Sequence, residues 1–491
     1  MSLRTLPRLP REMAPLVDPI GLRCGIVHLG LGAFHRAHQA LCTEHAVASA
    51  GGDWGICGVA QRRGRVRDQL VPQDGLYSVM VRGADRTRLR VVGVEREALV
   101  AAEDPAAVVA RLVDPDIHVA TLTVTEKGYH FDPATGSLRW DHAELVGDLA
   151  GDGPYTPIGQ LGRGLAARRR AGSGPLTVVC CDNLADNGVV VASLVRQFVE
   201  RLPDADELWA WIEREVRFPS TMVDRIVPAT TAADREAAAE RLGLWDEGVV
   251  VTEPFSQWVI EERFAGPRPA WERGGAFFTD SVRPFERAKV RLLNGSHSTL
   301  AYLAQLAGYP LVSDVLAADS PIVGLVERLM SVEVVPTLEP VAGLEFGRYQ
   351  AELLERFANP ALPHRTAQIA MDGSQKLPQR LLGTVADSRR AGEEPVAALL
   401  GVAAWIRWIV DRTADDGRAL EIDDPLSETI AANVGPGRPV AETLDYVLGL
   451  RAVLAEEVAL DPVVRGILAD HLERLRRDGA EATARHVVHE P

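Results

Sequence analysis

Short apolar runs alternate with longer amphipathic stretches through the first 285 residues of this chain. The runs that are rich in β-branched or apolar residues and end at turn or polar residues predict strands at 25–29, 54–60, 89–94, 118–124 and 176–181. The stretches around them predict helices at 37–50, 105–112, 158–171 and 188–202. This alternation predicts an α/β domain built on a mostly parallel, doubly wound sheet.

The second part of the chain has a different pattern, in which apolar positions recur at helical spacing. Helices are predicted at 300–306, 322–330, 395–410, 443–460 and 463–477, with proline and glycine turns between them. We therefore predict two domains, an α/β domain over 1–285 and a mainly α-helical domain over 286–491.

Composition and charge narrow the class of protein. The 491 residues include 53 Lys plus Arg and 68 Asp plus Glu, which gives a net charge of −15 and argues against a nucleic-acid partner. Residues 1–11 lack the apolar core of a signal peptide, and no apolar run is long enough to predict a membrane-spanning helix. The five cysteines are too few for a disulfide framework, and this favours a reducing cytoplasm.

A glycine turn follows the first predicted strand and precedes the first predicted helix. The turn reads Gly30-Leu31-Gly32-Ala33-Phe34-His35-Arg36. Glycines at this place let the backbone approach a dinucleotide diphosphate, although His35 stands where the usual motif has a third glycine. Two glycines alone are also typical of a turn that is tight for steric reasons only. The flanking strands favour nucleotide binding.

The end of the second predicted strand is where such domains recognise the ribose. The stretch Gln61-Arg62-Arg63-Gly64-Arg65 contains arginines and no acid. Arginine here would accommodate the 2′-phosphate of NADP, whereas an acid would favour NAD. The alternative is a solvated basic loop with no contact to a cofactor.

Three polar residues follow the domain boundary at a spacing that suits one helix face. On an α-helix, Lys289, Asn294 and His297 fall within an arc of about 140°. A desolvated lysine can act as a base near neutral pH, an asparagine amide can donate to a carbonyl oxygen, and a histidine can hold a hydroxyl. The alternative is a surface lysine, an asparagine that ends a helix and a core histidine.

Two further polar positions interrupt apolar surroundings. Asn183 follows the strand at 176–181, and the carboxyl end of a strand is where doubly wound sheets bind ligands. Asp224 precedes Arg225, so it belongs either to a substrate pocket or to an internal ion pair.

The ordered motifs of the chain resemble those of one enzyme family. They are Gly30-x-Gly32-Ala33-Phe34-His35-Arg36-Ala37-His38-Gln39, Thr123-Val124-Thr125-Glu126, Cys181-Asp182-Asn183, Met222-Val223-Asp224-Arg225-Ile226, Lys289-x4-Asn294-Gly295-Ser296-His297 and Asp372-Gly373-Ser374-Gln375-Lys376-x-Pro378. Together they resemble the polyol-specific long-chain dehydrogenases, the mannitol dehydrogenase family, over residues 21–480.

The resemblance implies a zinc-independent, nicotinamide-dependent enzyme with a Rossmann-type N-terminal domain and a helical C-terminal domain. It implies that the enzyme interconverts a secondary alcohol and a ketone of an open-chain sugar derivative. By motif, Lys289 is the general base, and Asn183 and Asn294 stabilise charge on the reacting oxygen. His297 then binds a substrate hydroxyl, and Glu286 passes the proton to solvent.

The resemblance also implies which residues contact the cofactor and the substrate. The expected cofactor contacts are Gly30, Gly32, Ala33, Phe34, His35, Arg36 and Arg62. NAD is expected because most of the family uses it, with NADP open because of the arginines. Asp224 is expected to support the substrate pocket. No metal is expected, because the cysteines show no zinc-ligand spacing.

Details of two motifs resemble the fructuronate reductase (D-mannonate oxidoreductase) branch. Gln368 stands where mannitol enzymes of the family usually have arginine, and Lys127 stands where they tend to have glycine. Lys127, Arg365 and Lys376 could pair with the carboxylate of a uronate. We therefore expect D-mannonate and D-fructuronate as substrates. D-mannitol 2-dehydrogenase, a related polyol dehydrogenase and a catalytically silent sugar-binding protein are the alternatives. A monomer or small homo-oligomer is expected.

Overall fold

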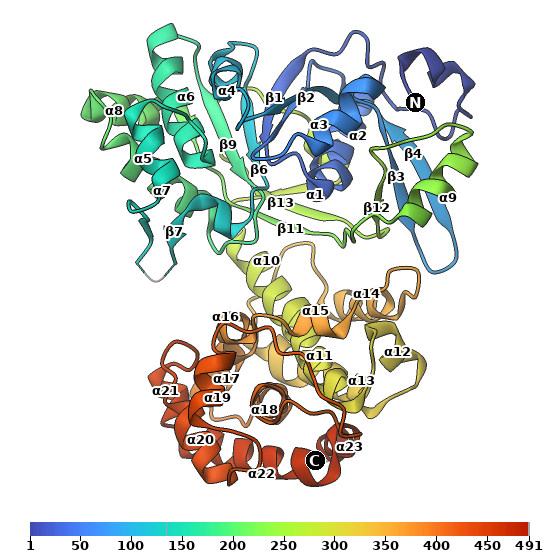
Figure 1. Cartoon of the computed structure of the whole chain (residues 1–491), viewed down its shortest axis with the longest axis vertical. Helices are drawn as coiled ribbons and strands as arrows, with labels where there is room; N and C mark the ends of the chain where they lie inside the picture. Colours follow the sequence, from blue (N-terminus) through green and yellow to red (C-terminus); the bar gives the residue numbers. More distant parts are fainter. Residues whose placement is uncertain (134, 490–491) are drawn as a thin grey trace. The chain divides into compact units, whose positions relative to one another are not determined.

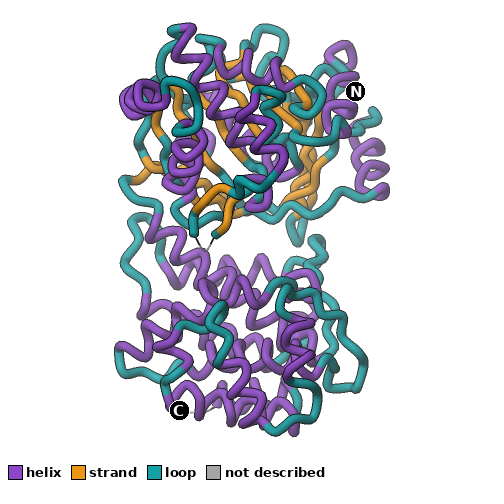
Figure 2. The backbone as a smooth tube through the Cα atoms, turned by 60° about the vertical axis from the view of Figure 1, so that its left-hand side comes forward, coloured by secondary structure: helices purple, strands orange, loops and turns teal. Residues whose placement is uncertain are grey.

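The computed structural model describes residues 1–133 and 135–489 and divides the chain into two compact units. One unit runs from Met1 to Arg283 and the other begins at Pro284, where the sequence predicts a boundary between 285 and 286. The named strands lie in the first unit, and helices make up most of the second (Figures 1 and 2). None of the described helices combines the length and the apolar character that a membrane crossing requires.

A six-stranded parallel sheet forms the centre of the first unit. Its strands lie in the order β10 (Val216–Arg217), β9 (Leu176–Cys180), β6 (Val119–Leu122), β1 (Cys24–Leu29), β2 (Gly55–Ala60) and β5 (Glu95–Val100). The chain passes outward from β1 to β2 and β5, and then returns to build the other half from β6. This is the doubly wound order predicted from the sequence. Its strand order reverses between β1 and β6, where such sheets bind ligands.

The prediction that a strand at 89–94 belongs to the parallel sheet is wrong. Strand β4 (Thr87–Val92) pairs antiparallel with β3 (Tyr77–Arg82), and β12 (Val250–Thr252) completes a separate three-stranded sheet. Arg88 and Arg90 alternate with buried Leu89 and Val91, which gives β4 one polar face. A polar face suits an antiparallel hairpin better than a parallel sheet that is covered on both sides.

Two smaller sheets complete the first unit. Strands β11 (Thr221–Asp224), β13 (Gln257–Glu261) and β14 (Ala276–Thr279) form one, and β7 (Phe131–Asp132) with β8 (Ser137–Leu138) forms a short hairpin. The first-unit α-helices are α1 (Ala33–Ala37), α2 (Gln39–Ala50), α3 (Arg65–Leu70), α4 (Pro105–Val113), α5 (Ala143–Ala150), α6 (Pro157–Ala171), α7 (Asn187–Val199), α8 (Ala205–Glu215) and α9 (Ala232–Leu242).

Two cores form on opposite faces of the parallel sheet. Val27 and Leu29 of β1 pack into a cluster with apolar residues of α4, α6 and α7. Ile26, the residue before Val27, packs instead with α2 and with residues of the two three-stranded sheets. Strand β1 is therefore buried on both faces, which explains its continuous apolar sequence.

The helix predicted at 37–50 is divided at His38. His38 has φ −127° and ψ −81°, and it separates α1, which starts directly after Gly32, from α2. Helix α1 thus begins at the glycine turn itself, four residues earlier than the pattern of apolar positions predicted.

The second unit is built around two helices in which nearly every residue is buried. These are α11 (Ser296–Ala307) and α18 (Val396–Asp411). The other α-helices are α10 (Arg283–Ala288, whose first residue belongs to the first unit), α12 (Val312–Ala317), α13 (Pro321–Arg328), α14 (Phe346–Ala358), α15 (Thr366–Ala370), α16 (Gly373–Leu377), α17 (Gly383–Arg390), α19 (Ser427–Asn433), α20 (Val440–Leu448), α21 (Glu456–Ala459), α22 (Pro462–Asp478) and α23 (Ala480–His489).

The predicted helices of this unit are present, with one correction. The single helix predicted at 443–460 is wrong, because α20 ends at Leu448 and α21 begins only at Glu456. Gly449 follows α20 directly, and glycine is a poor helix former.

Candidate functional site

The glycine turn between β1 and α1 has the backbone that a nucleotide site needs. Gly30 has φ +113°, and a Cβ there would lie 2.1 Å from the Thr123 carbonyl oxygen, so only glycine is accommodated. A Cβ at Gly32 would meet only the Gly30 carbonyl oxygen, at 3.6 Å. The chain's own packing therefore does not require glycine at position 32. The bare backbone leaves space there in which a diphosphate would fit.

The side chain of a buried histidine, His28, contacts the backbone of this turn. His28 Nδ1 lies 2.7 Å from Thr121 Oγ1, and His28 Nε2 lies 2.8 Å from Thr123 Oγ1 and 3.1 Å from the Gly30 carbonyl oxygen. Burial lowers the pKa of His28 well below its usual range, so the ring is neutral. His28 thus fixes the turn to the end of β6 without adding charge.

His35 and Arg36, predicted to contact the cofactor, have buried side chains that face the protein. His35 Nε2 lies 2.5 Å from Glu95 Oε1, and its ring stacks on that of His28. Burial raises the pKa of Glu95 and lowers that of His35, so the two form a neutral pair that shares one proton. Arg36 donates to the carbonyl oxygens of Gly248 and Gly32. Both residues support the turn, and only their backbone atoms remain for a cofactor.

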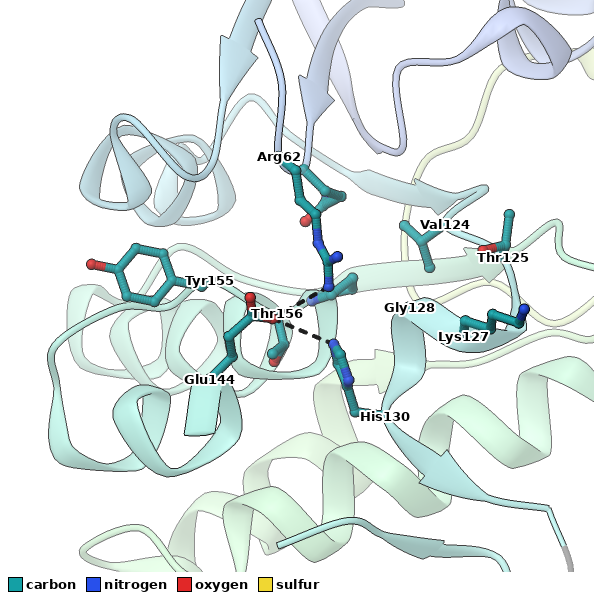
Figure 3. Close-up of a pocket in the computed structure, with 11 residues that line it drawn as sticks. Arg62, Val124, Thr125, Lys127, Gly128, His130, Glu144, Tyr155 and Thr156 are labelled. Carbon is teal, nitrogen blue, oxygen red and sulfur yellow. Dashed lines mark ion pairs between the residues drawn. The ribbon is translucent and has the colours of Figure 1, made fainter. Parts of the chain in front are cut away.

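A pocket of about 360 Å³ opens at the carboxyl ends of β2 and β6, the two neighbours of β1. Gln61, Arg62, Thr125, Lys127 and Glu144 contribute to its walls (Figure 3). Arg62 is 70% exposed and lies 3.6 Å from Glu144 of α5. The arginine after the second strand therefore faces an acid supplied by a distant helix. Lys127, predicted to bind substrate, lines this same pocket.

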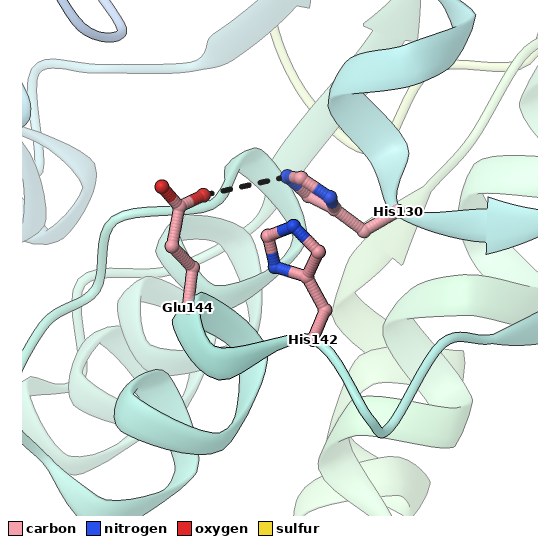
Figure 4. Close-up of side chains that lie close together, drawn as sticks. All are labelled: His130, His142 and Glu144. Atoms are coloured by element: carbon pink, nitrogen blue, oxygen red, sulfur yellow. Dashed lines mark ion pairs between the residues drawn. The ribbon is translucent and has the colours of Figure 1, made fainter.

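Two residues of this pocket, His130 and Glu144, lie close to a third potential metal ligand, His142. The ligand atoms of His130, His142 and Glu144 lie within 4.8 Å of one another (Figure 4), the one such group that the described residues form. The pKa of His130 is lowered, mainly because the side chain is partly buried. Glu144 also pairs with Arg62, a cation that competes with a metal for the carboxylate. Of the three residues, His130 and Glu144 line the pocket.

Asp182 connects the loops that follow β6 and β9. It accepts hydrogen bonds from the backbone N–H of Val124 (3.0 Å) and Thr125 (2.8 Å) and from the hydroxyl of Tyr129 (2.6 Å). Asn183, the predicted amide donor, follows directly and is exposed. The same loop is tied to β11, because Asn187 donates to the carbonyl oxygens of Asp182 and Thr221. Asn183 is therefore held on a fixed loop at the carboxyl edge of the sheet.

Asp224 lies at the end of β11 and is 6% exposed. Its neighbour Arg225 donates to the carbonyl oxygens of Ala37 and Glu253. The side chain of Arg225 is thus engaged with backbone oxygens.

In the second unit, Lys289, Asn294 and His297 belong to one unbroken helical stretch. Helix α10 passes into a π-helical segment, η5 (Lys289–Gly295), which passes into α11. The arc of about 140° applies to an α-helix, whereas the segment from Lys289 to Gly295 is π-helical. A π-helix bonds residue i to i+5, so it brings Lys289 and Asn294 onto one face more closely than an α-helix would. Lys289 is 9% exposed and Asn294 is half-buried.

His297 has the properties of a neutral hydrogen-bonding group. It is 8% exposed, its ring stacks on Phe357 with centroids 4.2 Å apart, and its Nε2 is buried without a hydrogen-bond partner. Burial is the main cause that lowers the pKa of His297 well below its usual range, and nearby cations including Arg380 and Lys289 add to it. A buried polar atom with no partner costs free energy unless a ligand satisfies it.

The remaining predicted residues of this unit differ in environment. Lys376 Nζ donates to the Met371 carbonyl oxygen at 2.6 Å, and burial lowers the pKa of Lys376. Arg365 is exposed at the start of α15, and Glu286 is half-buried on α10. Arg380, which the sequence analysis did not select, donates to Ser298 beside His297. Arg380 follows Lys376 by four residues, and this helical spacing could have indicated that the two cations lie close together.

Comparisons with known proteins identify the family. The mannitol dehydrogenase Rossmann domain matches residues 24–273, and the mannitol dehydrogenase C-terminal domain matches residues 281–475. The chain belongs to the mannitol dehydrogenase family. Its two units therefore correspond to the Rossmann and C-terminal domains of this family of oxidoreductases.

Similarity to members of the mannitol dehydrogenase family extends over nearly the whole chain. The D-mannonate oxidoreductase of Escherichia coli (strain K12) is 39% identical over 95% of this chain and 96% of its own length. The uncharacterized oxidoreductase YeiQ of the same organism is 41% identical over 92% and 93%. The mannitol 2-dehydrogenase of Pseudomonas fluorescens, solved as a ternary complex with NAD and D-mannitol, is 34% identical over the full length of both chains with a TM-score of 0.87.

Proposed function

We propose that this member of the family is an NAD-dependent oxidoreductase that interconverts D-mannonate and D-fructuronate. The observation that carries the proposal is the π-helical stretch with Lys289, Asn294 and the neutral, unpartnered Nε2 of His297. A base, an amide donor and a hydroxyl-binding imidazole on one helix are the groups that an alcohol–ketone reaction needs in place of a metal.

Each residue has a chemical task in this proposal. Lys289 Nζ takes the proton of the reacting hydroxyl in oxidation and returns it to the ketone oxygen in reduction. Asn183 and Asn294 donate amide N–H groups to that oxygen while it carries negative charge. His297 Nε2 accepts from a substrate hydroxyl, Glu286 transfers the proton of Lys289 towards solvent, and Asp224 supports the substrate pocket. NAD, when bound, supplies the hydride acceptor.

The first unit supplies the proposed cofactor contacts. Gly30 and Gly32 give the diphosphate access to the backbone, and the backbone of Ala33 to Arg36 continues that surface. Arg62, Lys127 and Glu144 line the pocket for the adenosine end. We assign Lys127 to the nucleotide side rather than to the substrate, because it shares this pocket with Arg62. NADP remains the alternative cofactor.

The choice of a uronate rests on cations of the second unit. Lys376 and Arg380 lie four residues apart, and both contribute positive charge near the Asp372-Gly373-Ser374-Gln375-Lys376 motif. A uronate adds a carboxylate that such cations can pair with. The identity with the D-mannonate oxidoreductase of Escherichia coli supports the same choice. The likeness to the mannitol 2-dehydrogenase of Pseudomonas fluorescens favours D-mannitol and D-fructose as the second candidate pair.

The test is a substrate panel followed at the nicotinamide absorbance. Fructuronate, tagaturonate, fructose and xylulose are each offered with NADH and with NADPH, and kcat/KM is measured. We expect the highest value for fructuronate with NADH. A higher value for fructose would reject the uronate, activity with NADPH alone would reject NAD, and no turnover with any pair would reject the enzyme itself.

A further inference from the structure

A second cavity, of about 620 Å³, lies in the first unit between α2 and the β3–β4 hairpin. Its helix side is lined by His38, Leu41, Cys42 and His45. It shares no lining residue with the pocket that contains Arg62 and Glu144. Its size falls in the range of small-molecule sites.

The hairpin directs two arginines to this cavity. In the antiparallel register, Val79 pairs with Arg90 and Val81 pairs with Arg88, and all four residues line the cavity. Residues two apart on a strand share a face, so the hairpin offers an apolar strip beside a cationic one.

The wall of the cavity contains more positive than negative side chains. Arg225 and Arg241 join Arg88 and Arg90 in its wall, whereas Glu12 is its one acidic lining residue. In the described part of the chain, no carboxylate oxygen lies within 4.0 Å of these four guanidinium groups, although Arg82 of the same hairpin pairs with Asp234 at 2.5 Å. Four such arginines around one cavity are unusual in a chain with a net charge of −15.

The guanidinium group of Arg225 has one N–H donor that makes no hydrogen bond. Its two Nη groups donate to the carbonyl oxygens of Ala37 (2.5 Å) and Glu253 (2.9 Å), while its Nε is buried with no hydrogen-bond partner. Burial lowers the pKa of His45, and the charges of Arg90 and Arg225 lower it further. Both guanidinium groups therefore lie close enough to His45 to influence its protonation. A bound anion would reduce the mutual repulsion of the arginines.

We propose that this cavity binds a small organic anion with at least two negative charges, separate from the nucleotide and substrate of the dehydrogenase reaction. Arg88 and Arg90 pair with the anionic groups, since a guanidinium matches phosphate and carboxylate oxygens in a two-bond geometry. Leu41, Val79 and Val81 contact the carbon skeleton of the ligand. Phosphate esters and polycarboxylates share this chemistry.

The test is isothermal titration calorimetry on the full chain at low ionic strength. Glucose 6-phosphate and citrate are the two probes, and saturating NADH is present so that the nucleotide pocket is occupied. We expect saturable binding of at least one probe, and the tighter probe identifies the phosphate ester or the polycarboxylate as the better class. No saturable binding of either probe would overturn the proposal.

Two matched variants locate the binding. Arg88→Gln with Arg90→Gln should weaken binding about tenfold or more, because charge-assisted hydrogen bonds are lost. Arg86→Gln changes an exposed arginine of the same hairpin that does not line the cavity, and it should leave the affinity within about twofold. Equal affinity of the double variant and the wild type would overturn the proposal.

One further variant separates this proposal from the catalytic one. Lys289→Ala should bind the anion as the wild type does, because Lys289 does not line the cavity. Loss of anion binding in this variant, with unchanged thermal unfolding, would place the anion at the substrate site and overturn the inference.

Discussion

Lys289 and Asn294 occupy the first and sixth positions of one π-helical segment, Lys289–Gly295. In an α-helix five residues span about 500°, so the two side chains would diverge by about 140°. The i to i+5 bonding of a π-helix places them about one turn apart. A local change of helix type thus aligns the proposed base with the proposed amide donor, and π-helical turns are frequent at functional sites.

Replacing Lys289 should remove turnover and leave nucleotide binding intact. For Lys289→Ala we expect kcat/KM to fall by about 10²–10⁴-fold, the usual contribution of a positioned acid–base group. NADH affinity, measured by fluorescence titration, should stay within about twofold. An activity within tenfold of the wild type would contradict the role of Lys289 as the base.

The π-helical segment depends on glycine at position 295. A Cβ there would lie 2.6 Å from the Arg380 carbonyl oxygen, so Gly295→Ala must displace backbone that positions Arg380. We expect a loss of about 1–3 kcal/mol in unfolding free energy, together with lower kcat. Gly466→Ala is the matched control, because nothing lies within 4 Å of a Cβ at that helical glycine. The control should be neutral or up to about 1 kcal/mol more stable. Equal urea midpoints for the two variants would contradict the argument.

The buried Glu95 should make stability depend on pH. Burial raises its pKa from 4.5 to about 8, so between these values the unfolded chain loses a proton that the folded chain retains. The contribution of Glu95 to the unfolding free energy therefore falls as pH rises through this window, by up to about 1.4 kcal/mol per pH unit. His35, whose pKa is lowered to about 3 by burial, contributes in the opposite direction below pH 6.5, and it does so in both proteins of the comparison. The Glu95→Gln variant keeps the shape of the side chain but has no carboxyl group that can titrate. The difference in unfolding free energy between wild type and variant should shift in favour of the variant from pH 5 to pH 8, and a constant difference would contradict the neutral His35–Glu95 pair.

Glu144 should influence the preference between NADH and NADPH. Its carboxylate lies 3.6 Å from Arg62 and offsets a charge that could otherwise pair with a 2′-phosphate. Glu144→Gln should shift the affinity ratio towards NADPH by about two- to fivefold, a small effect because the ion pair is exposed to solvent. Asp141→Asn changes a nearby exposed acid that does not line the pocket, and it should leave the ratio unchanged. No shift in Glu144→Gln would show that Arg62 does not contact the cofactor.

Local patterns predicted much of the fold. The apolar runs of β1, β2, β6 and β9 identified four parallel strands, since strands buried on both faces have continuous apolar sequences. The pattern misassigned β4 and passed over β5, whose Glu95 is polar in sequence and yet fully buried beside His35. A buried acid is compatible with a parallel strand only when a partner from elsewhere in the chain neutralises it, and sequence does not reveal that partner.

Residue types and their spacing revealed which groups are available: a glycine turn after a strand, a lysine with an asparagine and a histidine downstream, and an acidic chain with few cysteines. The surroundings of these groups depend on the folded chain. It paired Arg62 with Glu144, buried the side chains of His35 and Arg36, and made the helical segment that begins at Lys289 a π-helix. It also gathered Arg88, Arg90, Arg225 and Arg241 around one cavity. The physical reason is that residue type and spacing act over a few positions, whereas burial and charge environment depend on contacts between segments far apart in the chain.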